Sequence, residues 1–258
     1  MRRTKLQMTH SVQPLGFGLD VNHHIGYVMK NVRFAALFSA VLLVGCATPP
    51  QPPVSLVGSS LTTVNSRVGV AVLPIPAADT EFPGAGCLLC YAAASVANST
   101  LTEHTKTLGP EELPKLRTEV ADLLRKRGIN AVEITTDLKL KELPDFSGTA
   151  GANVAAKDFS RLRSALNVDK LVVIDVKFIG FQRNYSSYVP TGNPNARFSA
   201  TGYLVNLSTN TYEWYLPVNV LKSSDGSWDE PPKFPGLTNA YYQSLEIGKD
   251  TLLKPLGQ

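Results

Sequence analysis

The sequence predicts an α/β fold: a single domain with a mixed sheet of about five strands, helices packed on it, and a C-terminal helix. Apolar, β-branched segments at residues 67–74 and 170–181 alternate with amphipathic helical segments, which is typical of a sheet covered by helices. Residues 197–207 and 211–220 alternate in period two around a short turn and therefore predict a hairpin. The 258 residues are 43% hydrophobic and 18% charged, a composition that supports a core.

The first half of the domain is expected to contain two strands and one helix. The segment at residues 67–74 is nearly all apolar, which favours a central strand, and Pro74 ends it. Residues 110–127 carry leucine and valine at three- and four-residue spacing, with acids at the start and bases at the end. This pattern predicts an amphipathic helix. A short strand is expected at residues 131–134.

The second half is expected to contain a helix, a central strand, a hairpin and a final helix. The first of these helices covers residues 159–166, and the central strand covers residues 170–181. The final helix is expected at residues 238–254, after the hairpin. The pattern shows no internal repeat and no second core, so one domain is predicted.

A secretory signal precedes the domain. Residues 29–46 begin with a basic stretch and continue with an apolar run at residues 34–44. That run is shorter than the ~20 residues that span a bilayer. The order of charge, apolar run and small residue is typical of a signal peptide that starts at Met29.

The end of the signal, Leu43-Val44-Gly45-Cys46, resembles the lipobox of bacterial lipoproteins. The resemblance implies that Cys46 receives fatty acyl chains such as palmitate and becomes the mature N-terminus. It also implies sorting to the outer membrane, because Ala47 stands where aspartate would favour the inner membrane. We therefore expect a lipid-anchored protein on the periplasmic face of the outer membrane.

These features predict the organisation of the chain. Residues 1–45 are the leader and lipoprotein signal peptide, and residues 46–66 are the lipidated cysteine with a Pro/Ser/Thr-rich tether. Clustered prolines favour the extended polyproline II conformation, which suits a tether. Residues 67–258 form the periplasmic α/β domain, in which residues 75–109 are a cysteine-containing insertion.

Processing changes the charge of the protein. The whole chain has 25 basic and 21 acidic residues, of which residues 1–45 hold five and one, so the mature part has 20 of each. A neutral domain gives no reason to expect nucleic acid as a partner. Membrane attachment is then expected through the lipid anchor.

Cys87 and Cys90 are the two thiols that remain once Cys46 is acylated. An extracytoplasmic compartment oxidises such pairs, so a structural disulfide is predicted. One alternative is an exchange-active pair with Cys87 at a helix N-terminus. Another is a zinc site that adds His104 and a carboxylate. The small-residue segment at residues 88–97 is expected to pack as a helix on the sheet or to form an oligomer contact or an inserting segment.

No catalytic residue, metal site or cofactor is predicted. His104 is the one imidazole left after processing, and its polar surroundings indicate a surface histidine. Nucleophile-elbow, phosphate-binding and zinc-protease motifs are absent from the sequence. Asp175, inside an apolar strand, is expected to lie at a strand end or to make a structural hydrogen bond rather than to act as a catalytic acid. The acids that a carboxylate-dependent hydrolase would use are Asp225, Asp229 and Glu230.

Aromatic side chains in two loops are the candidate binding residues. They are Tyr185, Tyr188, Trp228 and Phe234. Tyrosine and tryptophan supply rigid, amphipathic contact area and are common at binding hot spots. We expect them to contact an envelope protein, a peptide or a glycan, or else to cap the open end of the sheet.

A group of periplasmic proteins shares this order of elements. The segments "RVGVAVLP", "LRTEVADLLRKRGINAVEI", "LRSALNVDKLVVIDV" and "YLVNLSTNTYEWYLPVNV" resemble the α/β fold of the TolB N-terminal domain, CsgG and LpoB over residues 67–221. The resemblance implies non-catalytic work, in which the domain docks partners or assembles envelope machinery. A homo-oligomer is a further possible partner, through the small-residue segment at residues 88–97. Disulfide exchange or carboxylate-dependent hydrolysis is the enzymatic alternative.

Overall fold

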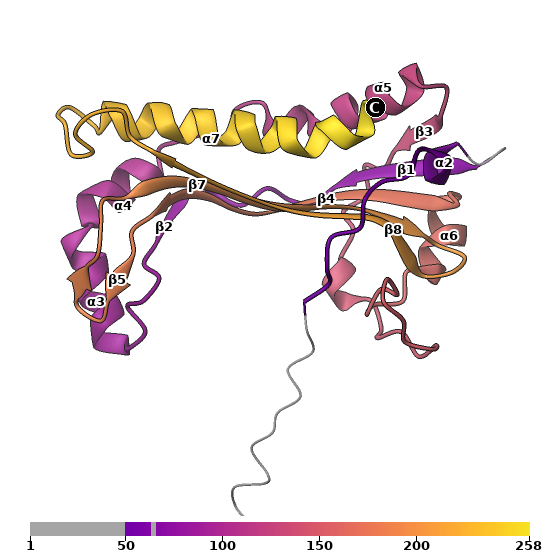
Figure 1. Ribbon diagram of the computed structural model, residues 1–258, viewed down its shortest axis with the longest axis horizontal. Helices are drawn as coiled ribbons and strands as arrows, with labels where there is room; N and C mark the ends of the chain where they lie inside the picture. The colour runs from indigo at the N-terminus through magenta and orange to yellow at the C-terminus, as the bar shows by residue number, and fades with distance from the viewer. Residues whose placement is uncertain (1–49, 63–65) are drawn as a thin grey trace, which may run out of the picture. The chain divides into compact units, whose positions relative to one another are not determined.

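The computed structural model describes residues 50–62 and 66–258 (Figure 1). Gln51–Gln258 form one compact unit, and its α/β architecture confirms the predicted fold class. The predicted leader, signal peptide and Cys46 lie outside the described residues. Within residues 50–62 and 66–258, no helix is long and apolar enough to cross a membrane.

The main sheet has the strand order β3-β1-β4-β7-β8. The strands are β1 (Arg67–Val72), β3 (Asn130–Glu133), β4 (Lys170–Gln182), β7 (Asn195–Asn206) and β8 (Thr211–Ser223). The first strand pairs in parallel with β3 and β4, whereas β7 is antiparallel to both of its neighbours, β4 and β8. The sheet is therefore mixed, as predicted, and the hairpin of β7 and β8 forms one side of it.

A sixth strand, β2 (Asp79–Glu81), lies within the cysteine-containing insertion and extends the same sheet. It pairs in parallel with the C-terminal end of β4, where Asp79 stands opposite Gly180. Gly180 has a φ of 145°, and a Cβ there would collide with the carbonyl group of Asp79. The three-residue strand "DTE" carries no periodic apolar signal, so the sequence did not predict it.

Two helices cover one face of the sheet (Figure 1). They are α5 (Leu116–Lys126), which follows the 3₁₀ turn Leu113–Lys115, and α7 (Pro235–Leu253), which continues into the 3₁₀ turn Lys254–Leu256. Proline has no N–H to donate and sits best in a first turn, and Pro114 lies in the 3₁₀ turn before α5. The core on this face includes Ile174, Phe198, Trp214, Tyr241 and Leu245.

A second apolar cluster covers the other face at one end of the sheet. It packs α6 (Ser160–Leu166) and the 3₁₀ turn Leu140–Glu142 beneath the N-terminal half of β4. Tyr203, Tyr212 and Tyr215 form an aromatic group within it, and burial, then Tyr215, raises the pKa of Tyr212 to about 12. Further along β4, this face carries an ion pair between Asp175 and Lys177.

Part of the predicted tether packs on the domain. The backbone groups of Val54 and Tyr215 exchange two hydrogen bonds of 2.9 Å, and Leu61, in α2 (Gly58–Leu61), is buried. Leu56 also contacts the main core. These apolar side chains give the segment surface to bury against the sheet, so residues 51–62 belong to the folded body in addition to residues 66–258.

Candidate functional site: the disulfide arm

Two segments project together from the C-terminal end of β4. They are residues 82–98, which contain α3 (Leu88–Ala97), and residues 184–191, which contain the small hairpin of β5 (Tyr185–Ser186) and β6 (Val189–Pro190). We call them the disulfide arm (Figure 1). The next helix, α4 (Ser99–Thr105), connects the arm to the domain.

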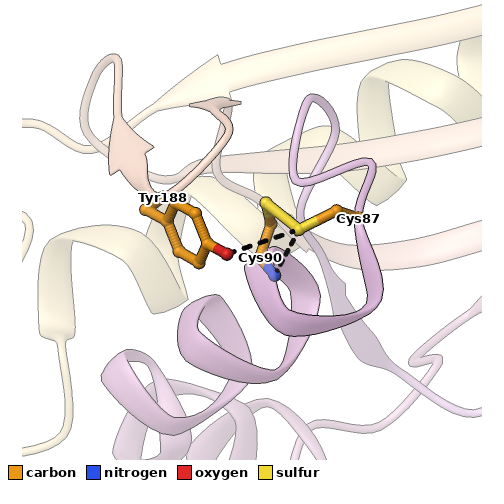
Figure 2. Close-up of a disulfide and its surroundings, with 3 residues drawn as sticks. All are labelled: Cys87, Cys90 and Tyr188. Carbon is orange, nitrogen blue, oxygen red and sulfur yellow. Dashed lines mark hydrogen bonds between the residues drawn. A yellow bond between two sulfur atoms is a disulfide. The ribbon is translucent and has the colours of Figure 1, made fainter. Parts of the chain in front are cut away.

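The predicted disulfide between Cys87 and Cys90 is present at the start of α3 (Figure 2). Cys87 is the N-cap residue, and its Sγ accepts a 2.9 Å hydrogen bond from the backbone N–H of Cys90. That bond satisfies one of the N–H groups that a helix start leaves unpaired. The Oη of Tyr188 lies 3.7 Å from the same sulfur, so the hairpin touches the disulfide directly.

A small core holds the two segments of the arm together. It consists of Phe82, Ala85, Cys90, Ala94 and Tyr185. The ring of Phe82 meets that of Tyr185 edge-on with 5.9 Å between centroids, which is a favourable aromatic geometry. The backbone N–H of Tyr185 also donates to the carbonyl of Pro83 over 2.7 Å. The arm thus has its own hydrophobic centre, separate from the main core.

A polar network attaches the arm to the rest of the domain. Buried Asn98 donates to the Oη of Tyr185 over 2.6 Å and accepts from the Arg183 guanidinium over 2.9 Å. The Arg183 guanidinium stands 4.9 Å from the centre of the Trp228 ring, which stacks on Phe234 with 6.1 Å between centroids. Buried polar groups are costly when unpaired, so this network fixes the arm where the sheet ends.

The four candidate binding aromatics occupy different positions in this arrangement. Tyr185 is buried in the arm's core, and Trp228 and Phe234 are half-buried against the main core. Tyr188 alone of the four is exposed. The structure therefore gathers them at one end of the sheet, where Tyr185, Trp228 and Phe234 support the arm and Tyr188 faces solvent.

The outer surface of the arm is apolar. In the part of the chain that the structure describes, nine large apolar side chains are exposed, and six of them lie on the arm. The six are Leu88, Leu89, Tyr91, Val96, Tyr188 and Val189. In the sequence, the two leucines between the cysteines suggest burial, and the exposure of Leu88 and Leu89 shows that this expectation is wrong. The available signal was a helix that is apolar all round, since such a helix cannot bury every side against one sheet.

The residues considered for catalysis lie on different elements: His104 on α4, Asp175 on β4, and three acids on the loop before α7. His104 Nε2 contacts the hydroxyl of Thr238 over 2.8 Å, and burial, then the charge of Lys233, lowers the pKa of its imidazole. Asp175 forms an ion pair with Lys177. The acids of the hydrolase alternative, Asp225, Asp229 and Glu230, are all exposed on the loop before α7.

Two further kinds of candidate site are a metal site and a ligand cavity. Among residues 50–62 and 66–258, no three histidine, cysteine or acidic side chains gather as a metal would require. A polar cavity of about 640 Å³ lies beside α6. Its Asp169 accepts hydrogen bonds from the Arg67 backbone and the Arg163 side chain, and these lower its pKa. Asp169 in this cavity is therefore already paired with Arg163.

Comparisons with known proteins do not assign a family. No known family profile matches the chain, and no curated protein matches it. Among solved structures, a PelC dodecamer from Paraburkholderia phytofirmans is 10% identical, with a TM-score of 0.31, over 81% of this chain and 94% of its own. A DUF330 protein from Xanthomonas campestris is 15% identical, with a TM-score of 0.36, over 80% and 92%.

A third match is the lipoprotein GNA1162 from Neisseria meningitidis. It is 13% identical with a TM-score of 0.26, over 70% of this chain and 96% of its own. Similarity at this level identifies neither a family nor an activity. The resemblance to the TolB N-terminal, CsgG and LpoB group is not confirmed by these matches.

Proposed function

We propose that this chain is a lipoprotein of the bacterial outer membrane whose periplasmic domain is a non-catalytic binding or assembly module. The lipobox at Cys46 supplies the anchor, and the disulfide arm supplies the binding surface. The observation that carries the proposal is the concentration of exposed apolar side chains on one braced projection of the domain. Contiguous exposed apolar surface marks interaction sites in proteins that are otherwise soluble.

The construction of the arm also supports a binding role. A disulfide, a small core and a buried asparagine hold the arm in one conformation. A surface that is fixed before binding loses less conformational entropy when a partner docks. Location in an oxidising compartment would keep the disulfide closed.

A thiol–disulfide exchange enzyme is the second candidate. The observation in its favour is that Cys87 is exposed at the N-terminus of α3 while Cys90 is buried. Helix N-termini stabilise thiolates and so favour exchange. Incubation with a thiol-reducing agent and a model disulfide separates the two functions. Stoichiometric reduction without turnover supports the binding module, and multiple turnovers that Cys87→Ser abolishes support the exchange enzyme.

The anchor is tested by fractionation of cells that express the full chain or its Cys46→Ser variant. The proposal predicts that the unchanged chain sediments with outer membranes. The variant, which has no thiol to acylate, should leave that fraction. Equal recovery of both chains from the cytoplasm would contradict the proposed location.

A further inference from the structure

The outward side of α3 is an apolar face that no described residue covers. Leu88, Ala92 and Val96 follow one another at four-residue spacing, so they share one side of the helix. Leu89 and Ala93 extend this face, whereas Cys90 and Ala94 point into the arm's core. Leu88 is 86% exposed at the helix start. The other exposed apolar residues at that end come from the hairpin, at Tyr188 and Val189.

The arm carries no formal charge. Its two segments contain no aspartate, glutamate, lysine or arginine, and the uncharged stretches extend beyond them, over residues 82–102 and 184–196. Charged groups resist transfer into a lipid interface, whereas leucine, valine and tyrosine enter it readily. Protein interfaces, by contrast, usually surround an apolar centre with a polar rim. The composition of the arm therefore fits a lipid surface better than a folded protein partner.

The arm and the N-terminal end of the folded body lie on the same side of the sheet (Figure 1). The backbone of Val54 is hydrogen-bonded to that of Tyr215, whose ring packs in the second apolar cluster on that side. The helices α5 and α7 cover the opposite side. A surface that approaches this side of the body therefore faces the arm at one end and α6 at the other, rather than α7 (Figure 1).

Only a short stretch of chain separates the proposed anchor at Cys46 from the folded body. This step rests on the proposed function, which places the lipid on Cys46. Gln51, whose side chain donates to the carbonyl of Ala152, is the fifth residue after Cys46. Five extended residues span at most about 18 Å. A lipid on Cys46 would therefore hold this side of the domain close to the membrane.

We propose that the disulfide arm binds the lipid bilayer that carries the anchor, with the outer face of α3 in the interfacial region. The helix has ten residues and lies on the membrane rather than across it. The disulfide and the Asn98 network keep Leu88 and Leu89 directed outward. The anchor and the arm then form two contacts with one membrane, which fix the orientation of the domain.

The test places a tryptophan on the arm of the lipidated full-length protein in phosphatidylethanolamine–phosphatidylglycerol vesicles. Leu88→Trp reports on the arm, and its exposed position accepts the larger side chain. Ile247→Trp is the matched control, since Ile247 is also an exposed apolar residue on a helix, 45% exposed on α7. The emission of unchanged protein, which has two tryptophans, is subtracted.

The proposal predicts a blue shift of the Leu88→Trp emission on vesicles and loss of that emission with brominated acyl chains, with neither change for Ile247→Trp. With Cys46→Ser added, the same shift should appear at higher lipid concentration. Leu88→Ser with Leu89→Ser should weaken vesicle binding of that unlipidated chain by at least about tenfold.

Three other outcomes are distinguishable. Protein that floats with vesicles while Leu88→Trp emission stays unchanged overturns the arm's role and leaves the anchor standing. An unacylated Cys46 with a lipid-dependent shift overturns the anchor and supports the arm. A shift that follows protein concentration without lipid shows that a second copy covers the face, which overturns the proposal.

Discussion

At the scale of single residues, the arm depends on side chains that other residue types could not replace. Asn98 uses both ends of its amide, to Tyr185 and to Arg183, and a carboxylate or an aliphatic residue could not do this. Gly84 has a φ of 87°, and a Cβ there would overlap the carbonyl of Tyr185. These contacts join segments about a hundred residues apart, so the sequence alone does not reveal them.

Gly84→Ala should destabilise the domain by more than about 1 kcal/mol, because alanine disfavours the left-handed region and its Cβ would displace the hairpin. Gly86→Ala is the control, since a Cβ there meets nothing within 4 Å. Denaturant unfolding of both variants measures the difference. Equal stability of the two variants would mean that the hairpin does not pack on Gly84 as described.

His104 should make stability depend on pH. Burial, then Lys233, lowers its pKa below the usual 6.5, so the folded state favours the neutral imidazole. The free energy of unfolding is therefore highest, as far as His104 is concerned, above pH 6.5. It decreases as the pH falls below that value, because the unfolded chain binds the proton before the folded protein does. His104→Gln should flatten this part of the profile. After removal of residues 1–45 a single imidazole remains, and its NMR titration should give a pKa below 6.5.

At the scale of elements, long apolar strands and periodic helices were predictable from the sequence. The segment at residues 170–181 became β4, Lys170–Gln182, and the expected hairpin became β7 and β8. The final helix begins at Pro235, three residues before the expected start at residue 238. Phe234 precedes it with a φ of 53°, so the exact start depends on a loop conformation that apolar spacing does not report.

Elements made by tertiary contact were not predictable. The strand β2 exists because Gly180 lets its backbone approach β4. Residues 51–62 dock through Val54 and Leu61, which a proline-rich composition conceals. The disulfide was predictable from the cysteine count and the expected compartment. The outward direction of Leu88 and Leu89 was not predictable, because it depends on where the helix lies relative to the sheet. The cation–π contact between Arg183 and Trp228 was likewise not predictable from the sequence.

Removal of the disulfide should loosen one element and leave the sheet intact. Cys87→Ser with Cys90→Ser removes the crosslink at the start of α3, and the entropy model gives about 2 kcal/mol for so short a loop. Hydrogen exchange should become faster in α3 and stay unchanged in β4. Uniform acceleration in both would show that the arm and the sheet unfold as one unit.

At the scale of the whole molecule, a very short chain would join the proposed N-terminal anchor to the folded body. Residues 46–258 carry equal numbers of basic and acidic residues, so their net charge gives no long-range attraction to anionic surfaces. The proposed membrane attachment would then depend on acyl chains and on apolar contacts. Fixed orientation at the membrane would leave the face covered by α5 and α7 turned toward the periplasm and free for partners.

The mass of the mature N-terminal peptide, measured on chain purified from the cell envelope, tests the central claim directly. The account predicts a peptide that begins at Cys46, has lost residues 1–45 and carries the added mass of its acyl chains. A chain that retains those residues with an unmodified Cys46 would contradict it.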